Sequence, residues 1–352
     1  MKGYDVMSKR NKPVVFLMAA VMLSIIFCGT AVRDADAAEI KSRTMVFHYA
    51  GPLDCTNARF ANSFKELVER KSGGKLKIDI YGQNILGTDI DCLSTMKVGK
   101  VDFMVTVPAM VVNVIPALAV YDIPFTFDNV KSARTALSDP QWLSVIGKEY
   151  EKAGYHLLAT SDSNFRVIST NKEIKGIDDF KGMKLRTMEN KNHIAFFNAL
   201  GVKATPLNAS EVYLALQQGM LQGQENPYSQ IYDKKLYEVQ KYVTNSNHIF
   251  HNIIFFTGQA TWKSLQPEAQ KIIWDAAQET AKKISDYSDK SEGEFLNKLV
   301  KERGVKFIDF DKIPGLRKEL RKATLKGAKD RAAKQVDPKL LAAYLKACGI
   351  KD

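Results

Sequence analysis

Hydrophobic positions in the first half of the chain follow two alternating spacings. Short runs with the pattern of strands are separated by runs with the three-to-four-residue spacing of amphipathic helices. Strands that alternate with helices predict a mainly parallel sheet covered by helices. In order, the runs predict a strand at 45–49, a helix carrying Phe60, Phe64, Leu67 and Val68 and ended by Gly73 and Gly74, a strand at 76–80, a helix at 90–96 ended near Gly99, and a strand at 101–105.

A second series of the same kind begins near Phe165. Its runs predict strands at 166–170, 182–187, 202–205 and 251–257, helices at 192–200, 211–218 and 228–237, and one long helix from Pro267 to about Arg303. Two series in a chain of 352 residues exceed what one ordinary core holds. No linker rich in Pro, Gly or Ser separates them, so we expect a two-lobed α/β fold in which the chain crosses between lobes more than once, as in a hinge.

The expected division follows from these series. It places a signal peptide at 1–37, lobe I at 38–163 plus about 252–290, lobe II at 164–251 plus about 291–315, and a C-terminal helical segment at 316–352.

The N-terminus has the pattern of a secretory signal peptide. Basic residues precede an apolar run from Val14 to Phe27, and small residues flank Asp36, which favours cleavage after Ala37. An uncleaved anchor is the alternative, but the run is shorter than the ~20 residues of a membrane span. A lipid anchor on Cys28 is a further alternative, which the bulky Phe27 disfavours. We expect a periplasmic protein.

Charge limits the class of partner. The net charge of +12 falls to +10 without residues 1–37, because that segment holds five bases and three acids. A basic surface attracts nucleic acid, anionic lipid or anionic solutes. Much of the surplus lies between Arg317 and Lys334, where it reads as the solvated face of a helix, and no nucleic-acid motif with interleaved aromatics occurs. We therefore expect no nucleic-acid partner.

Three cysteines remain after export, Cys55, Cys92 and Cys348. Cys55 and Cys92 each follow a strand-like run, so they pair if those strands are neighbours, and Cys348 is then left over. An oxidising compartment permits such a bond, and the residues leave the question open. No Cys or His spacing resembles a zinc site, and we expect no metal or cofactor.

The sequence contains no motif of a common enzyme class. It lacks a G-x-S-x-G elbow, an H-E-x-x-H pair, a Walker loop and a G-x-G-x-x-G loop. The five histidines show neither metal-ligand nor triad spacing, which favours surface or packed roles. The enzyme hypothesis therefore has no residue to support it.

Two arginines stand in predicted strands of the second series, Arg166 and Arg186. An arginine among apolar residues is costly unless it meets an anion. Its guanidinium binds a carboxylate through two parallel hydrogen bonds. The expectation is that neither has a protein counter-ion, so that a ligand acid supplies it. An internal salt bridge is the alternative that the residues leave open.

The segment from Asp179 to Pro227 resembles the periplasmic binding proteins of TRAP transporters, the DctP-like family. The resemblance is carried by D-x-K-G-x-K-L-R at 179–186, A-L-G-V at 199–202, T-P at 205–206, S-E-V-Y-L-A-L-Q-Q-G at 210–219 and G-Q-E-N-P at 223–227. Looser agreement extends it to about 45–310. The resemblance implies a two-lobed periplasmic-binding-protein fold that closes around a small organic anion and passes it to membrane permease subunits.

The resemblance also implies roles for three residues. Arg186, in the K-L-R segment, forms the salt bridge to the ligand carboxylate. Arg166 contacts the same end of the ligand, and Asn226, in the Q-E-N-P segment, donates its amide.

Departures from the family pattern bear on the ligand. Val107 and Met110 stand where sialic-acid binders carry a glutamate and an arginine, and Ala209 replaces an aromatic, so sialic acid is disfavoured. With Tyr49 they predict a more apolar wall in lobe I, which favours a monocarboxylate with an apolar or aromatic body, such as an amino or keto acid. Glu189 accepts from an amine or hydroxyl of the ligand, or is a solvated loop acid. A monomer is expected, and the alternatives are an exported enzyme or a binding protein that serves a sensor.

Overall fold

The computed structural model of the protein describes residues 40–350. The predicted signal peptide, its cleavage site and Cys28 lie outside the described residues. Within them, no helix combines the length and the apolarity that a membrane crossing requires.

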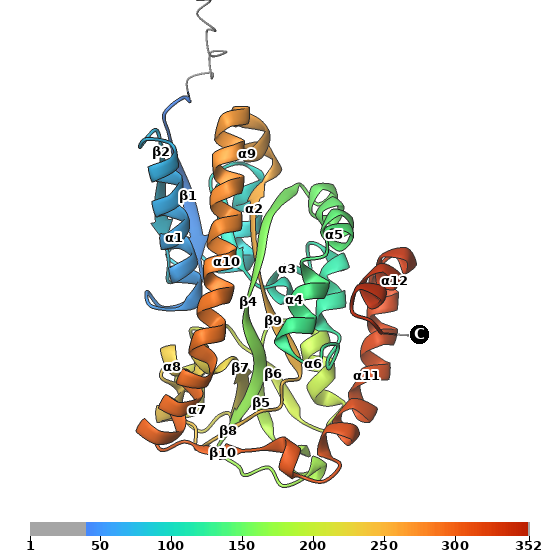
Figure 1. The fold of residues 1–352 in the computed structure, drawn as a ribbon. Coiled ribbons are helices and arrows are strands. Elements are labelled where there is room, and N and C mark those ends of the chain that lie inside the picture. Colours follow the sequence, from blue (N-terminus) through green and yellow to red (C-terminus); the bar gives the residue numbers. More distant parts are fainter. Residues whose placement is uncertain (1–39, 351–352) are drawn as a thin grey trace, which may run out of the picture. The chain divides into compact units, whose positions relative to one another are not determined.

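The described residues form a ten-stranded sheet with the order β2-β1-β3-β9-β4-β7-β5-β6, and off this path the short β8 pairs with the end of β4 and β10 pairs with β8. The strands are β1 (Arg43–Tyr49), β2 (Leu76–Tyr81), β3 (Phe103–Thr106), β4 (Tyr155–Thr170), β5 (Lys184–Thr187), β6 (Lys203–Pro206), β7 (Gly223–Asn226), β8 (Tyr242–Thr244), β9 (Ile249–Gly258) and β10 (Lys306–Ile308). Below, lobe I is the half that contains β1, β2 and β3, and lobe II is the half that contains β5, β6 and β7 (Figure 1).

The two-lobed α/β fold is confirmed, and the strands of the first series, β1, β2 and β3, form parallel pairs as predicted, but the sheet as a whole is mixed. Parallel pairs occur at both ends, where β1 lies between β2 and β3, and β5 lies between β6 and β7. In the middle, β9 runs antiparallel to β3 and to β4, and β4 runs antiparallel to β7. The sheet is mixed because these middle strands return from one lobe to the other.

Two long strands connect the lobes. β4 pairs with β9 along Tyr155–Arg166 and then continues to pair with β7 in lobe II. The register between β4 and β9 shifts between Asp162 and Phe165, and Asn164 there has a φ of +59°. An asparagine tolerates this left-handed conformation better than most residues, so the bulge is a defined bend between the lobes.

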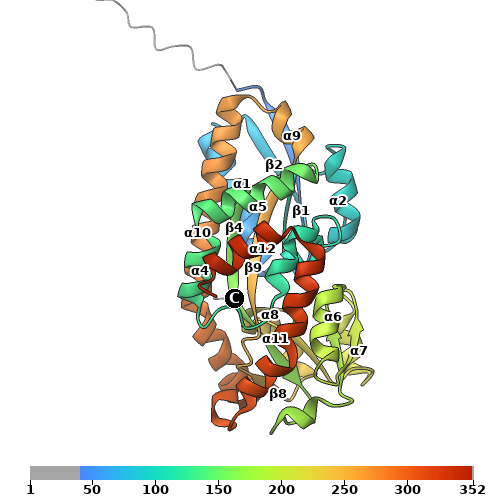
Figure 2. The same ribbon diagram turned by 90° about the vertical axis from the view of Figure 1, so that its right-hand side faces the viewer.

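The helices cover both faces of this sheet (Figure 2). They are α1 (Thr56–Lys71), α2 (Asp89–Lys97), α3 (Pro108–Val111), α4 (Val130–Leu137), α5 (Pro140–Lys152), α6 (Lys191–Asn198), α7 (Val212–Gln217), α8 (Tyr228–Asp233), α9 (Gln259–Ser264), α10 (Pro267–Asn297), α11 (Leu316–Gln335) and α12 (Pro338–Ala347). Short 3-10 helices occupy Pro116–Asp122, Ile177–Phe180, Leu236–Glu238 and Phe310–Lys312, and a π-helical turn at Lys298–Glu302 follows α10.

Helix α10 contributes to the cores of both lobes. Its first part, through Ile273 and Ala277, packs with α1 in lobe I. Phe295, near its end, packs with Tyr228 and Ile231 of α8 in lobe II. The predicted long helix is therefore present, and it runs beside β4 as a third connection between the lobes (Figure 1).

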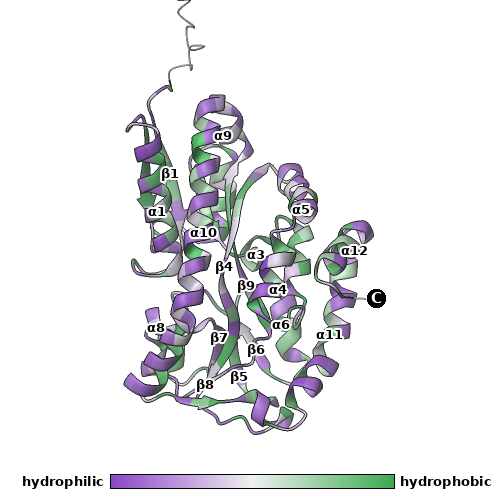
Figure 3. Ribbon diagram, viewed as in Figure 1, coloured by the Kyte–Doolittle hydropathy of each residue, from purple (hydrophilic) through white to green (hydrophobic). Residues whose placement is uncertain are grey.

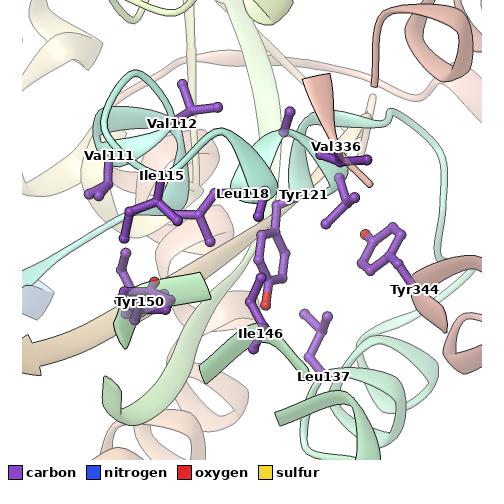
Figure 4. Close-up of a cluster of buried hydrophobic side chains, with 14 of the residues drawn as sticks. Val111, Val112, Ile115, Leu118, Tyr121, Leu137, Ile146, Tyr150, Val336 and Tyr344 are labelled. Carbon is purple, nitrogen blue, oxygen red and sulfur yellow. The ribbon is translucent and has the colours of Figure 1, made fainter. Parts of the chain in front are cut away.

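The C-terminal helices also join both lobes. Leu316 and Leu320 of α11 pack in a lobe II cluster. Val336 and Tyr344, at the end of α11 and in α12, pack instead with Tyr121 and Leu118 of lobe I (Figure 4).

The prediction of a solvated basic face on α11 is confirmed. The buried residues of this helix recur about every fourth position, at Leu316, Leu320, Thr324, Ala328 and Ala332. The bases between them are mostly exposed, and in Figure 3 hydrophilic and hydrophobic stretches alternate along the helix.

The cysteines do not form the disulfide that the strand order allowed. Cys55, Cys92 and Cys348 are all free. Although β1 and β2 are neighbours, Cys55 belongs to the apolar cluster around α1 and α10, whereas Cys92 belongs to the cluster around α2 and α5. Cysteines that follow neighbouring strands thus enter different cores.

Candidate functional site

A cavity of about 90 Å³ lies between the two lobes. Its lining comes from the strands of each lobe and from the loops and helix starts that follow them, the usual place for a ligand site in an α/β protein. Lobe I contributes Ala50, Gly51, Cys55, Asn57, Asn84, Asp89, Thr106, Val107 and Met110, and the remaining lining is Arg166, Arg186, Met188, Glu189, Asn208, Ala209, Asn226, Gln230, Lys234 and His251.

Seven of the eight site residues predicted from the sequence line this cavity: Arg166, Arg186, Asn226, Glu189, Val107, Met110 and Ala209. Tyr49 does not. It is 2% exposed and packs in the core of lobe I, where its ring lies so close to Gly82 that a Cβ there would be 2.3 Å from Cζ. Tyr49 is therefore a core residue that leaves no room for a side chain at position 82.

Arg186 is a buried cation without an acidic partner. It lies at the end of β5, is 3% exposed, and donates from Nε and Nη2 to the carbonyl oxygen of Leu207, at 2.9 and 2.5 Å. No carboxylate of residues 40–350 forms an ion pair with it. Burial lowers the pKa of Arg186 to about 10, so it is still charged at neutral pH. Arg186 thus lacks a protein counter-ion, as expected from the sequence, and its role in binding a ligand acid stays a prediction.

Arg166 differs from that prediction, because it has a protein counter-ion. Its Nε donates to one carboxylate oxygen of Glu225 and its Nη2 donates to the other, at 2.7 Å. Nη1 donates to Nδ1 of His251, at 2.7 Å. The alternative of an internal salt bridge is thus the correct one for Arg166, and most of its donors are already used.

Glu225 is fully buried and holds this network together. Burial acts to raise its pKa, but the charge of Arg166 and hydrogen bonds from His248 and Arg166 outweigh burial and hold the pKa well below its usual range. His248 Nε2 lies 3.3 Å from the Glu225 carboxylate. Sequence reasoning missed this acid although it stands inside the Q-E-N-P segment. The available signal was an acid directly before Asn226, a residue already assigned to the site.

Asn226 is oriented by the same strands. It opposes Val167 across the β4–β7 pair, its Oδ1 accepts from Arg166 at 3.3 Å, and its Nδ2 donates to Gln224 at 2.5 Å. An amide nitrogen carries two hydrogens. One N–H of Asn226 therefore remains for a ligand.

The wall from lobe I is more polar than the sequence predicted. Val107 and Met110 are apolar, but Asn57, Asn84 and Asp89 line the cavity as well. Asp89 is held by His48 at 3.0 Å and by the hydroxyl of Thr106 at 2.5 Å. The side-chain oxygen of Asn84 is buried without a hydrogen-bond partner among the described residues. This acceptor suits a hydroxyl or an amine of a ligand.

Lys234, near the end of α8, is a second cation that sequence reasoning missed. It is half-buried and makes no ion pair or side-chain hydrogen bond within residues 40–350.

Glu189 is exposed at the edge of the cavity. No group of acidic, His or Cys side chains in the described part of the chain is arranged to hold a metal ion.

Comparison with known proteins identifies the family. The family model described as bacterial extracellular solute-binding protein, family 7, matches residues 47–332. The C4-dicarboxylate-binding protein DctB of Bacillus subtilis is 29% identical over 249 residues, which are 70% of this chain and 70% of that protein.

Two solved structures are similar over nearly their whole length. The sugar acid binding protein DctPAm from Advenella mimigardefordensis, in complex with galactonate, has a TM-score of 0.81 and 30% identity, covering 88% of this chain and 99% of that one. A TRAP periplasmic solute binding protein from Haemophilus influenzae with bound L-gulonate has a TM-score of 0.79 and 30% identity, covering 86% and 99%. The chain therefore belongs to the bacterial extracellular solute-binding proteins of family 7, the DctP-like solute-binding proteins of TRAP transporters.

Proposed function

We propose that the protein captures a small organic acid in the cavity between its lobes and delivers it to the permease subunits of a TRAP transporter. The observation that carries the proposal is Arg186, a buried guanidinium in the cavity wall without a carboxylate partner in the described chain. A buried charge of this kind is costly until an anion neutralises it. The similar proteins whose names specify a ligand bind carboxylic acids, which supports the same ligand class.

The donors left on Arg186 and Asn226 suit a carboxylate. Nη1 of Arg186 makes no hydrogen bond to the described residues, and one N–H of Asn226 is not used. Hydrogen bonds to charged groups contribute about 1.5–3 kcal/mol each. A few of them therefore supply much of the roughly 8 kcal/mol that a micromolar affinity represents. Arg166 then acts mainly by fixing Glu225 and Asn226, with its remaining Nη1 hydrogen as an additional donor.

Thermal unfolding in the presence of a panel of organic acids tests the proposal. An acid that binds the folded protein alone raises its melting temperature. Arg186→Met should remove the rise, and Arg186→Lys should reduce it because lysine cannot grip a carboxylate bidentately. Lys184→Met, at an exposed position two residues earlier on β5, is the control and should keep the rise. A panel without any stabilising acid, or an Arg186→Met variant that behaves as the parent protein, would exclude this function.

We also propose that the acid is bound and released without conversion. The alternative, an exported enzyme on the same scaffold, predicts a product that differs in mass from the acid supplied. Mass spectrometry of the acid recovered after incubation distinguishes the two.

The family supports an extracellular location, and we propose a monomeric, periplasmic protein released by cleavage after Ala37. N-terminal sequencing of the exported protein checks the cleavage site. A sensor partner in place of a permease would appear as normal acid uptake in cells that lack the protein.

A further inference from the structure

The charged groups of the cavity divide into those that have a protein partner and those that do not. Arg166 is neutralised by Glu225, and Asp89 is held by His48 and Thr106. Burial and the neighbouring charge of Arg166 lower the pKa of His251 well below its usual range, so this histidine is neutral. Arg186 and Lys234 remain, and neither has an acidic partner among residues 40–350. The exposed Glu189 is the acid of the lining that is not engaged by another residue.

Lys234 lies between the cavity that contains Arg186 and a second cavity, and it lines both. A second cavity of about 340 Å³ is lined by Gly51, Pro52, Gln83, Asn84, Ala209, Ser210, Tyr213 and Lys234. It shares Gly51, Asn84, Ala209 and Lys234 with the cavity that contains Arg186. A ligand held by its carboxylate at Arg186 therefore has room to extend past Lys234.

The position of Lys234 is unfavourable without a ligand. Burial, followed by the positive charges of Arg186 and Arg166, lowers its pKa to about 8. Its neighbour Asp233 offsets this only in part. The charge of Asp233 acts to raise the pKa of Lys234, but no ion pair joins the two side chains, and burial with the nearby Asp54 raises the pKa of Asp233 to about 7. Lys235, the next residue, is exposed. A lysine that served only solubility would be exposed, as Lys235 is. We therefore infer that the partly buried ammonium of Lys234 is neutralised by an anion of the ligand.

We propose that Lys234 binds a second anionic group of the ligand, so that the cavity selects acids with two negative charges over acids with one. This inference rests on the proposed function, because it takes Arg186 as the site of the first carboxylate. It replaces the sequence-based preference for a monocarboxylate with an apolar body. The free acceptor of Asn84, which lines both cavities, favours a hydroxyl between or beside the two anionic groups.

The test compares each of several dianionic acids with its own monomethyl ester, which keeps the skeleton and removes one charge. Succinate, malate and glucarate serve as probes, and isothermal titration at pH 7 gives the affinity of each. An ionic hydrogen bond corresponds to about a tenfold to hundredfold change in affinity. At least one diacid should therefore bind the protein about tenfold to hundredfold more tightly than its ester.

Three variants assign this preference to Lys234. Lys234→Met should weaken the diacid about tenfold to hundredfold and leave the ester within about threefold. Lys234→Arg, which keeps the charge, should retain most of the preference. Lys235→Met changes the net charge by the same amount at the adjacent exposed position and should change neither affinity.

The outcomes separate the two proposals. If no acid or ester binds the parent protein, or if binding survives Arg186→Met, the proposed function itself fails. If acids bind through Arg186 but diacids show no preference over their esters, or if Lys234→Met weakens both equally, the role of Lys234 is wrong and the proposed function stands.

Discussion

At the scale of single residues, the two arginines of the cavity have opposite relations to the protein. Arg166 is neutralised by Glu225, whereas Arg186 meets only a carbonyl oxygen. Removal of one partner from a buried ion pair leaves an uncompensated charge and costs about 3–5 kcal/mol. We therefore expect Glu225→Gln to lower the free energy of unfolding by about that amount, as measured by urea denaturation without ligand.

Glu189→Gln is the matched control for this substitution, because Glu189 is exposed at the edge of the same cavity. It should change the free energy of unfolding by no more than about 0.5 kcal/mol. Equal effects of the two substitutions would show that the Arg166–Glu225 pair does not stabilise the fold.

At the scale of elements, the bend in β4 is hydrogen-bonded to α10. The Asn164 amide donates to the carbonyl of Ser288 at 2.9 Å and to Glu292 at 3.4 Å. Burial and the nearby charge of Asp162 raise the pKa of Glu292 to about 8, against an opposing effect of the hydrogen bond from Asn164. Because an unfolded glutamate has a pKa of about 4.3, the folded protein holds an extra proton between these values.

This proton predicts how stability depends on pH. Where the folded state binds more protons than the unfolded state, stability falls as the pH rises. Glu292→Gln is neutral throughout, so its melting temperature should gain on that of the parent protein between about pH 5 and pH 8.5. Glu294→Gln, which alters an exposed acid of α10 paired with Lys298 in the π-helical turn that follows, should follow the parent curve. Parallel curves for Glu292→Gln and the parent protein would contradict the assignment.

The elements also show why part of the fold escaped prediction from the sequence. Strands β1, β2 and β9 carry apolar residues at the spacing that burial demands. The middle of β4 reads Ser-Asp-Ser-Asn at 161–164 and β7 reads Gly-Gln-Glu-Asn, yet both are buried. Most of their polar side chains are hydrogen-bonded to α10, to Arg134 or to each other, as in the bond from the Ser161 hydroxyl to the Ala281 carbonyl, whereas the Ser163 hydroxyl has no partner among the described residues. Hydrophobic periodicity cannot reveal such strands.

The same limit applied to the site. Arg186 stood out as an arginine in a predicted strand, Asn226 came from the resemblance to a known family, and the structure brings both to the cavity. The sequence could not show which charged side chains have a protein partner. Strand pairing places Glu225 beside Arg166, and no acidic side chain of the described residues forms an ion pair with Lys234. The assignment of Tyr49 to the cavity wall differs from the structure for a related reason. The sequence predicted its position at the end of β1, but not that its ring turns into the core.

At the scale of the whole described chain, the cavity is built from two lobes that three elements connect, β4, β9 and α10. A ligand favours a closed arrangement only through contacts that it makes better there. Such contacts are available, because Asn57, Asn84 and Asp89 of lobe I line the same cavity as the cations of lobe II. We therefore expect a bound acid to reduce the radius of gyration measured by X-ray scattering, since it brings the two sets of groups together. The Arg186→Met variant at the same acid concentration should keep the larger radius, because it does not hold the acid. An acid that raises the melting temperature of the parent protein and leaves its radius unchanged would mean that binding occurs without movement of the lobes.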